Sequence, residues 1–316
     1  MADGALRAAL VARARLLERC RHFFAERGVL EVETPVLAQA TVTDVHLASL
    51  ETRIAGRPVP YYLQTSPEYA MKRLLAAGSG DIYQVCKVFR DDESGRHHNP
   101  EFTMLEWYRV GFDHRKLMEE VEALLATLLG AVLTLPAERL TYAEAFQRVL
   151  GLDPHAATLA ELEALAAERL GAADLGGERD VALDLLMGAL VGPALGAGRI
   201  TFVHEYPASQ AALARTLPGS PAVAARFEAY VCGLELCNGF HELADAAEQR
   251  RRFEADRHAR AARRLPLPPV DERLLRALAT GFPDCAGVAL GLDRVLMLAL
   301  GCDSLAGVLP FPVADA

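Results

Sequence analysis

The chain has 316 residues, of which 52% are hydrophobic and 24% charged, and these values fit one large globular domain or one domain with an insertion. Its net charge of -9 argues against a protein that grips long stretches of nucleic-acid backbone, because such proteins need clustered cationic charge. Six scattered cysteines without a Cys-x-x-Cys pair predict free thiols in a reducing compartment, by default the cytoplasm. We expect neither export nor membrane insertion, since we find no leader pattern and no apolar run of bilayer length.

The first part of the chain is predicted to combine two helices with short strands. Apolar residues recur at helical spacing over residues 6–27, and Gly28 follows as a helix stop. A second helix is predicted over residues 67–77. Runs of β-branched and aromatic residues predict strands over residues 29–33, 50–54, 61–64, 82–89 and 102–108.

The middle of the chain, about residues 114–198, is rich in Ala, Leu and Glu and is predicted to be a helical insertion. Two capping boxes support this, Thr141 with Glu144 and Thr158 with Glu161. Strands are expected again over residues 199–206, 226–242 and 287–292, with an Arg-rich helix over 246–264 and a last helix over 293–300, for which Asp293 is an N-cap candidate and first-turn anion. This arrangement predicts an α+β fold around an antiparallel sheet.

The most informative segment is residues 85–108, Val-Cys-Lys-Val-Phe-Arg-Asp-Asp-Glu-Ser-Gly-Arg-His-His-Asn-Pro-Glu-Phe-Thr-Met-Leu-Glu-Trp-Tyr. It has the pattern of two strands joined by a polar loop. Arg90 at the end of the first strand could neutralise a phosphate with its fixed N–H donors, and Phe102 could offer a flat face to an adenine ring. A surface hairpin with solvated charges would explain the same residues, so composition leaves both interpretations open.

Three acids recur every seven residues in a later strand region, namely Glu228, Glu235 and Glu242. An odd interval places side chains on opposite faces of an uninterrupted strand, so these acids can converge only if a bulge or turn intervenes. Gly233 and the Asn-Gly pair at 238–239 are candidates for that break. Converging carboxylates repel unless a hard dication bridges them to phosphates, which would imply Mg²⁺. The alternative is that one or more of the acids points into solvent.

Three segments of the chain resemble the signature motifs of class II lysyl-tRNA synthetases. Residues 89–108 resemble motif 2, residues 28–37 resemble motif 1, which forms the dimer interface in that class, and residues 287–294 resemble motif 3. Taken singly, the motif 1 and motif 3 segments would be interpreted as packing, but their order on either side of motif 2 favours the resemblance. It implies a single class II aminoacyl-tRNA synthetase-like catalytic domain over residues 1–316, with an antiparallel β-sheet flanked by helices, that activates an amino acid with ATP.

The resemblance also implies roles for the matching residues. Arg90 and Arg294 would be catalytic, on the α-phosphate and the terminal phosphate, and Glu228 and Glu235 would hold Mg²⁺. The residues implied in ATP binding are Arg90, Asp91, Asp92, His98, Asn99, Phe102, Glu235, Leu236, Gly291 and Arg294. Those implied in substrate binding are Ser66, Pro67, Glu68, Tyr108, Glu242 and Ala289.

Two regions depart from the synthetase pattern. Asp92 stands where the family has a glutamate that contacts the adenine amino group, so either the backbone approaches more closely or Glu93 takes over. Ser66 and Ala289 stand where the synthetases have alanine and glycine, and these bulkier residues predict a preference for a β- over an α-amino acid.

Other features have a functional and a plainer interpretation. Glu68 and Glu242 suit an amino acid with two positive charges, although Glu68 alone would also fit as a helix N-terminal acid. His97 and His98 lack metal-ligand spacing. The arginines of residues 250–264 suggest RNA binding or a docking patch for an acidic partner, but the interleaved acids favour a solvated helix face.

Residues 40–44, 207–211 and 285–294 resemble the family of elongation factor P–(R)-β-lysine ligases in particular. A lysyl-tRNA synthetase carries an anticodon-binding OB-fold before its core, and the single helix before motif 1 leaves no room for one. The resemblance implies that (R)-β-lysine and ATP form an adenylate, with Mg²⁺, and that a lysine amine of elongation factor P then attacks it. It further implies a cytoplasmic homodimer without stable tRNA binding or membrane attachment. A tRNA-acylating enzyme and a non-catalytic paralogue acting as a regulator are the alternatives.

Overall fold

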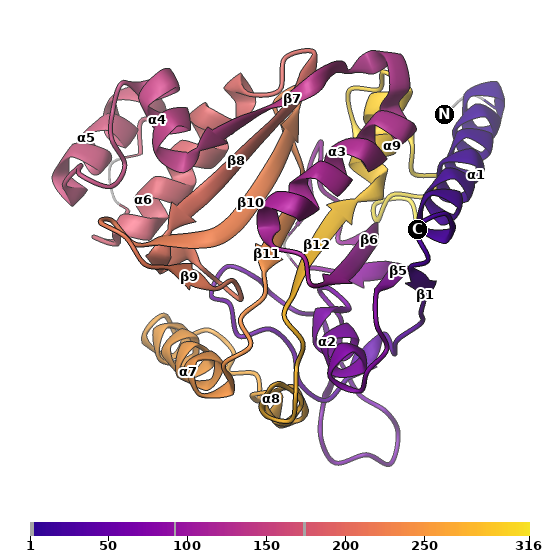
Figure 1. Ribbon diagram of the computed structural model, residues 1–316, viewed down its shortest axis with the longest axis horizontal. Coiled ribbons are helices and arrows are strands. Elements are labelled where there is room, and N and C mark those ends of the chain that lie inside the picture. The colour runs from indigo at the N-terminus through magenta and orange to yellow at the C-terminus, as the bar shows by residue number, and fades with distance from the viewer. Residues whose placement is uncertain (1–2, 92, 173–174) are drawn as a thin grey trace.

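The structure, a computed structural model, describes residues 3–91, 93–172 and 175–316, which form a long twisted sheet with helices around it (Figure 1). The strands are β1 (Leu30–Glu31), β2 (Leu37–Ala38), β3 (Glu51–Thr52), β4 (Tyr61–Leu63), β5 (Ile82–Phe89), β6 (Glu101–Val110), β7 (Thr134–Thr141), β8 (Arg199–Pro207), β9 (Thr216–Leu217), β10 (Val223–Val231), β11 (Leu234–His241) and β12 (Cys285–Gly291). The helices are α1 (Asp3–Ala25), α2 (Glu68–Ala76), α3 (His114–Leu129), α4 (Tyr142–Leu150), α5 (Leu159–Leu170), α6 (Arg179–Leu186), α7 (Ala246–Ala262), α8 (Glu272–Ala279) and α9 (Leu292–Ala299).

The large sheet has the strand order β1-β5-β6-β12-β11-β10-β8-β7, and β9 pairs with β10. Its central neighbours are all antiparallel, while the outermost pairs, β1 with β5 and β7 with β8, are parallel. The predicted α+β architecture, an antiparallel sheet flanked by helices, is therefore confirmed, with parallel additions at both edges.

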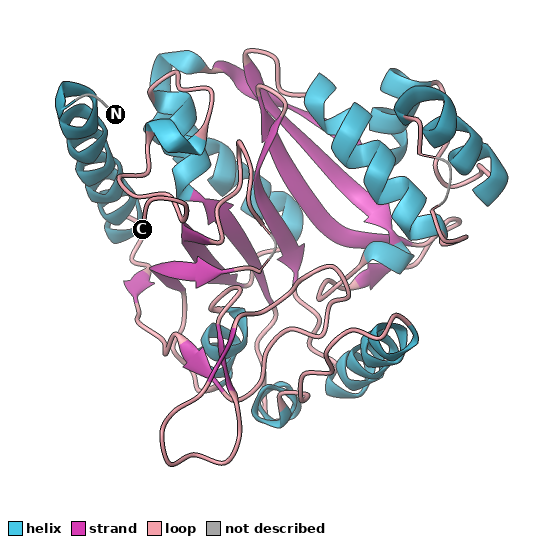
Figure 2. Cartoon of the chain, turned by 180° about the vertical axis from the view of Figure 1, so that it is seen from behind, coloured by secondary structure: helices cyan, strands magenta, loops and turns pink. Residues whose placement is uncertain are grey.

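One face of the sheet carries the main core, over which α3 and α9 lie in Figure 1. The alternation along β6 decides this, because Leu105 and Trp107 are fully buried in that core. Trp107 also donates its indole N–H to Glu120 of α3 at 3.0 Å. The even-numbered residues from Phe102 to Tyr108 alternate with these two core residues and therefore point to the opposite face of the sheet. Figure 2 views the molecule from that side.

A second core lies under α4, α5 and α6 at the far end of the sheet, where they pack on β8 and β10. Both predicted capping boxes are present, with Thr141 and Thr158 accepting from the backbone of Glu144 and Glu161. The prediction of a wholly helical region over 114–198 was wrong in one respect, because β7 lies within it and pairs with β8. The Ala- and Leu-rich composition of the surrounding helices concealed this strand.

Asp293 joins helices α1 and α9 to the sheet rather than capping α9. The N-cap of α9 is Gly291, so the predicted capping role of Asp293 was wrong, although Asp293 is a first-turn acid as expected. Its carboxylate accepts from the backbone N–H of Thr103 at 2.7 Å and pairs with Arg13 of α1 at 2.5 Å. Because Asp293 is only 2% exposed, these two partners have to compensate the free-energy cost of burying its charged carboxylate.

We expect Asp293→Ala to lower the free energy of unfolding by about 3 kcal/mol, since it leaves the buried Thr103 N–H and the Arg13 guanidinium without their acceptor. Urea denaturation followed by circular dichroism measures this. Asp303→Ala is the matched control, because Asp303 is 92% exposed and its 3.9 Å pair with Arg96 contributes little. Equal effects of the two substitutions would contradict the assignment.

Candidate active site

A cavity of about 1090 Å³ opens on the sheet face opposite the main core. Its walls come from β6, β11, β12, α2, α6, α7 and the loop of residues 42–47. The predicted site residues that line it are Ser66, Glu68, Arg90, His98, Asn99, Phe102, Tyr108, Glu235, Leu236, Glu242, Ala289, Gly291 and Arg294. Four segments far apart in sequence thus meet at one cavity.

Three of the predicted residues that the structure describes are not part of this wall, and a fourth is not described. Pro67 is the N-cap residue of α2. Asp91 forms a backbone bridge with Ala48, and Glu228 lies behind the wall at 6% exposure. Asp92 lies outside the described residues.

The predicted nucleotide end of the cavity is built by β5 and β6. Val88 of β5 pairs with Phe102 of β6, and Arg90 follows directly after the end of β5. The guanidinium carbon of Arg90 therefore lies near Phe102, 5.2 Å from the centre of its ring. Arg90 forms an ion pair with Glu93 at 3.3 Å, whereas its Nε is buried without a hydrogen-bond partner among the described residues. A flat ring beside an incompletely paired guanidinium suits a nucleotide whose base stacks and whose phosphate accepts.

Arg294 is held rigidly at the start of α9. It donates to the carbonyl of Glu235 at 2.7 Å and to the carbonyl of His97 at 3.2 Å, and its third nitrogen lies 2.7 Å from Nε2 of His98. Burial, and then the charge of Arg294, lower the pKa of His98. The imidazole is therefore neutral at pH 7 and can accept from the guanidinium, which fixes the direction of Arg294.

Asn99 has a structural task at the same end of the cavity. Its amide donates to the carbonyl of Glu101 at 2.6 Å and accepts from the backbone N–H of Val313 at 3.0 Å. It therefore ties the C-terminal segment to the start of β6 while it lines the cavity. Both ends of its side chain are occupied by protein groups.

Glu228 and Glu235 approach each other because β10 and β11 form a hairpin with a bulge at Ala229 and Tyr230. The predicted break is thus present, with the turn at Gly233, but not at residues 238–239, which lie inside β11. Gly239 is needed there for packing, since a Cβ atom would collide with the Phe227 ring and lie 3.0 Å from Cβ of Val288.

The two acids have different surroundings. Glu228 accepts from Arg226 at 2.5 Å and from the Tyr230 hydroxyl at 2.6 Å. Glu235 lines the cavity, and burial together with repulsion from Glu228 raises its pKa to about 7 despite the nearby guanidinium of Arg294. Among the described residues no group of three or more His, Cys, Asp and Glu side chains forms a ready metal site. A dication would fit beside Glu235 if phosphate oxygens supplied further ligands, which is how Mg²⁺ is commonly bound.

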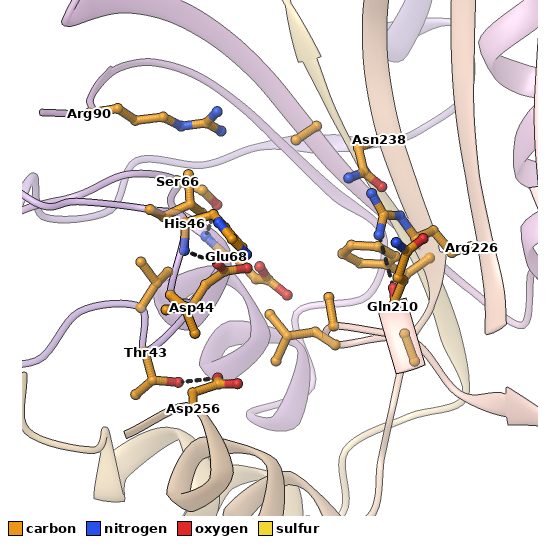
Figure 3. Close-up of a pocket in the computed structure, with 18 of the residues that line it drawn as sticks. Thr43, Asp44, His46, Ser66, Glu68, Arg90, Gln210, Arg226, Asn238 and Asp256 are labelled. Carbon is orange, nitrogen blue, oxygen red and sulfur yellow. Dashed lines mark hydrogen bonds between the residues drawn. The ribbon is translucent and has the colours of Figure 1, made fainter. Parts of the chain in front are cut away.

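The other end of the cavity is acidic. Glu106 is 2% exposed and accepts from the hydroxyls of Ser66 at 2.8 Å and Tyr108 at 2.7 Å. The Ser66 hydroxyl also accepts from the backbone N–H of Glu68 at 3.0 Å. Lys72 of α2 lies between Glu68 and Glu242. In Figure 3, Ser66 and Glu68 lie together below Arg90, across the cavity from Arg226.

Sequence reasoning missed Glu106 and Lys72. Each had a signal, since Glu106 shares a strand face with Phe102 and Tyr108, and Lys72 lies one helical turn after Glu68. Neither signal is specific for a functional site, because an acid in a strand and a lysine on a helix are common surface features.

Arginines of the Arg-rich helix α7 form ion pairs with glutamates or are buried. Arg250 contacts Glu272 at 2.5 Å, and Arg252 contacts Glu248 at 2.8 Å. Arg260 is buried and donates to the carbonyl of Asp44 at 2.6 Å, which holds the loop of residues 42–47 at the cavity. The prediction of a solvated helix face therefore holds for the exposed Arg250 but was wrong for the buried Arg260, and these contacts do not favour a basic binding patch.

None of the helices in the described part of the chain is both long and apolar enough to cross a bilayer. Residues 1–315 match the family model of the class II tRNA synthetases (D, K and N). The chain is also similar to proteins named elongation factor P–(R)-β-lysine ligase from Salmonella typhimurium and Salmonella enteritidis, at 53% identity over 97% of this chain and 95% of each relative. The chain therefore belongs to the class II tRNA synthetase family and, within it, to the family of elongation factor P–(R)-β-lysine ligases.

Proposed function

We propose that this chain is an ATP-dependent ligase that activates (R)-β-lysine as its adenylate and transfers it to a lysine side chain of elongation factor P. The observation that carries the proposal is the polarity of the cavity, with Arg90 and Arg294 at one end and the acids Glu68 and Glu242 at the other. ATP phosphates match the first end, and an amino acid with two ammonium groups matches the second. The names of the two Salmonella relatives support the choice of substrates.

In the first step a carboxylate oxygen of the amino acid attacks the α-phosphorus of ATP, and pyrophosphate leaves. In the second, the acceptor amine attacks the carbonyl carbon of the mixed anhydride, loses a proton and expels AMP. No enzyme nucleophile is needed, so the protein contributes positioning and charge neutralisation. Arg90 and Arg294 would neutralise the phosphates, and Phe102 would hold the adenine. Mg²⁺, when bound at Glu235 with Glu228, would neutralise further phosphate charge.

The remaining assignments are parts of the same proposal. A homodimer through the motif 1 segment is supported by exposed apolar side chains there, with Leu30 57% and Leu37 39% exposed. We infer a single catalytic domain over residues 1–316 without stable tRNA binding. The six free cysteines fit a cytoplasmic location.

ATP–pyrophosphate exchange with α-lysine and with (R)-β-lysine tests the activation step, and the intact mass of added elongation factor P tests the transfer. We expect exchange with (R)-β-lysine and a mass increase of one β-lysyl group on the acceptor. If neither amino acid supports exchange, the ligase function is contradicted. Transfer of the amino acid to tRNA instead of elongation factor P would favour the alternative of a tRNA-acylating enzyme.

Substrate preference is expected to depend on Ser66 and Ala289. Both line the cavity, and Ser66 orients Glu106 and the first turn of α2. The double substitution Ser66→Ala with Ala289→Gly is expected to shift the ratio of α- to β-lysine activation toward α-lysine by about tenfold, which is typical of a change of one or two small groups in a pocket. Exchange kinetics with both amino acids measure the ratio, and an unchanged ratio would remove these residues from the account.

A further inference from the structure

Lys72 is a buried cation immediately behind the acidic end of the cavity. Its side chain is 1% exposed, and its ammonium lies 2.6 Å from Oε1 of Glu68 and 2.5 Å from Oε2 of Glu242. Glu68 and Glu242 line the cavity, whereas Lys72 does not appear on the wall that the described residues form. The ammonium therefore supports both carboxylates from the protein side and leaves their cavity side to a ligand.

Lys72 is surrounded by more negative than positive charge. The charged and titratable groups that face Glu242 are Lys72 and Glu68 from α2, Glu106 and Tyr108 from β6, Arg215, which donates to the Glu242 carbonyl, and Asp284 with Cys285 at the start of β12. Arg215 is itself paired with Asp284 at 2.5 Å. The ammonium of Lys72 thus contacts two carboxylates, those of Glu68 and Glu242, and Glu106 is a third acid close enough to interact with both.

We propose that Lys72 is a positioning residue that holds Glu68 and Glu242 as anions directed into the cavity, so that the empty pocket is already arranged for an amino acid with two ammonium groups. This rests on the proposed function and names the device that prepares its substrate pocket. Without an internal cation, neighbouring carboxylates in a buried site take up protons or turn apart. Binding of an ammonium group would then have to deprotonate or reorient them, and this free-energy cost would lower the affinity.

Protonation gives this role a measurable signature. Burial raises the pKa of Glu242 to about 7, and the charge of Lys72 opposes the rise. Burial, and then repulsion from Glu68, raise the pKa of Glu106 to about 8. A carboxyl must lose its proton to bind an ammonium, so affinity increases as pH rises through these values. Removing Lys72 moves the requirement to higher pH, because the opposing charge is lost.

The test is calorimetric binding of (R)-β-lysine and α-lysine to the full chain at pH 7 and at pH 8.5. Lys72→Met is expected to raise the Kd relative to the unsubstituted protein by about thirtyfold at pH 7 and by about threefold at pH 8.5. ATP affinity should stay within about twofold, because the ion pairs of Lys72 in the described chain are with Glu68 and Glu242 and not with the groups at the nucleotide end. Lys116→Met, on the exposed side of α3, is the matched control and should leave all values unchanged.

A second substitution separates charge from packing. Lys72→Arg keeps a positive charge between Glu68 and Glu242 but changes the shape of the side chain, so this variant should regain much of the affinity that Lys72→Met loses at pH 7. If Lys72 only filled space, the loss in Lys72→Met would be the same at both pH values and Lys72→Arg would regain none of the affinity, and that result would overturn the proposal.

Two further outcomes are decisive. If Lys72→Met does not fold, Lys72→Gln decides, since it also removes the charge and keeps a polar side chain, and an unchanged affinity for (R)-β-lysine at pH 7 would overturn the proposal. If the unsubstituted chain binds lysine but gives no pyrophosphate exchange, the ligase function fails while the role of Lys72 in binding is still measured. The two failures are therefore distinguishable.

Discussion

Arg294→Ala is expected to lower kcat/KM for adenylate formation by about a thousandfold, because it removes a preorganised cation from the phosphates of the transition state. The side chain is held by the carbonyls of Glu235 and His97 and by His98, so little of its order has to be established during the reaction. ATP–pyrophosphate exchange under saturating β-lysine measures the loss.

Arg294→Lys should recover only part of this activity, since an ammonium cannot keep the same fixed pair of donors. Arg276→Ala on α8 is the matched control, because Arg276 is exposed and its side chain donates to the carbonyl of Glu272 within its own helix. A loss of less than tenfold in Arg294→Ala would show that Arg294 does not act on the phosphates.

Gly287→Ala is expected to weaken binding of the amino acid by about a hundredfold, because it changes the shape of the acidic end of the cavity. Gly287 lies opposite Tyr108 in the sheet. A Cβ atom at this position would collide with the Tyr108 ring and lie 2.6 Å from Oε1 of Glu242. Both side chains would have to move, and we also expect a loss of about 2 kcal/mol in the free energy of unfolding from overpacking.

Calorimetry with (R)-β-lysine and urea denaturation measure the two effects of Gly287→Ala. Gly188→Ala provides the matched control, since no neighbouring heavy atom lies within 4 Å of a Cβ atom placed there. ATP affinity should be nearly unchanged in both variants. Unchanged lysine affinity in Gly287→Ala would mean that the amino acid does not bind between Tyr108 and Glu242.

Local sequence pattern predicted much of the fold. The bounds of β5 agree with the predicted strand over 82–89, and both capping boxes are where their Thr and Glu residues indicated. These features depend on neighbours a few residues apart, which a sequence displays directly. β7 was missed because its pairing with β8 depends on a segment about 60 residues later, and its own composition resembles that of the helices around it.

The sequence by itself determined which chemistry-bearing residues are present and in what order, including Arg90, Phe102, Glu235 and Arg294. These lie in segments whose resemblance to the synthetase motifs is a property of the chain alone. The roles assigned to the individual residues stay predictions, which the proposed substitutions test.

Only the tertiary structure decided which acids meet and what supports them. The bulge at Ala229 and Tyr230 brings Glu235 beside Glu228, and the packing of α2 brings Lys72 to Glu242. Register and helix packing are set by contacts across the whole core, so spacing along the chain could not reveal them. A buried lysine with two carboxylates therefore became visible only when the distant segments were seen together.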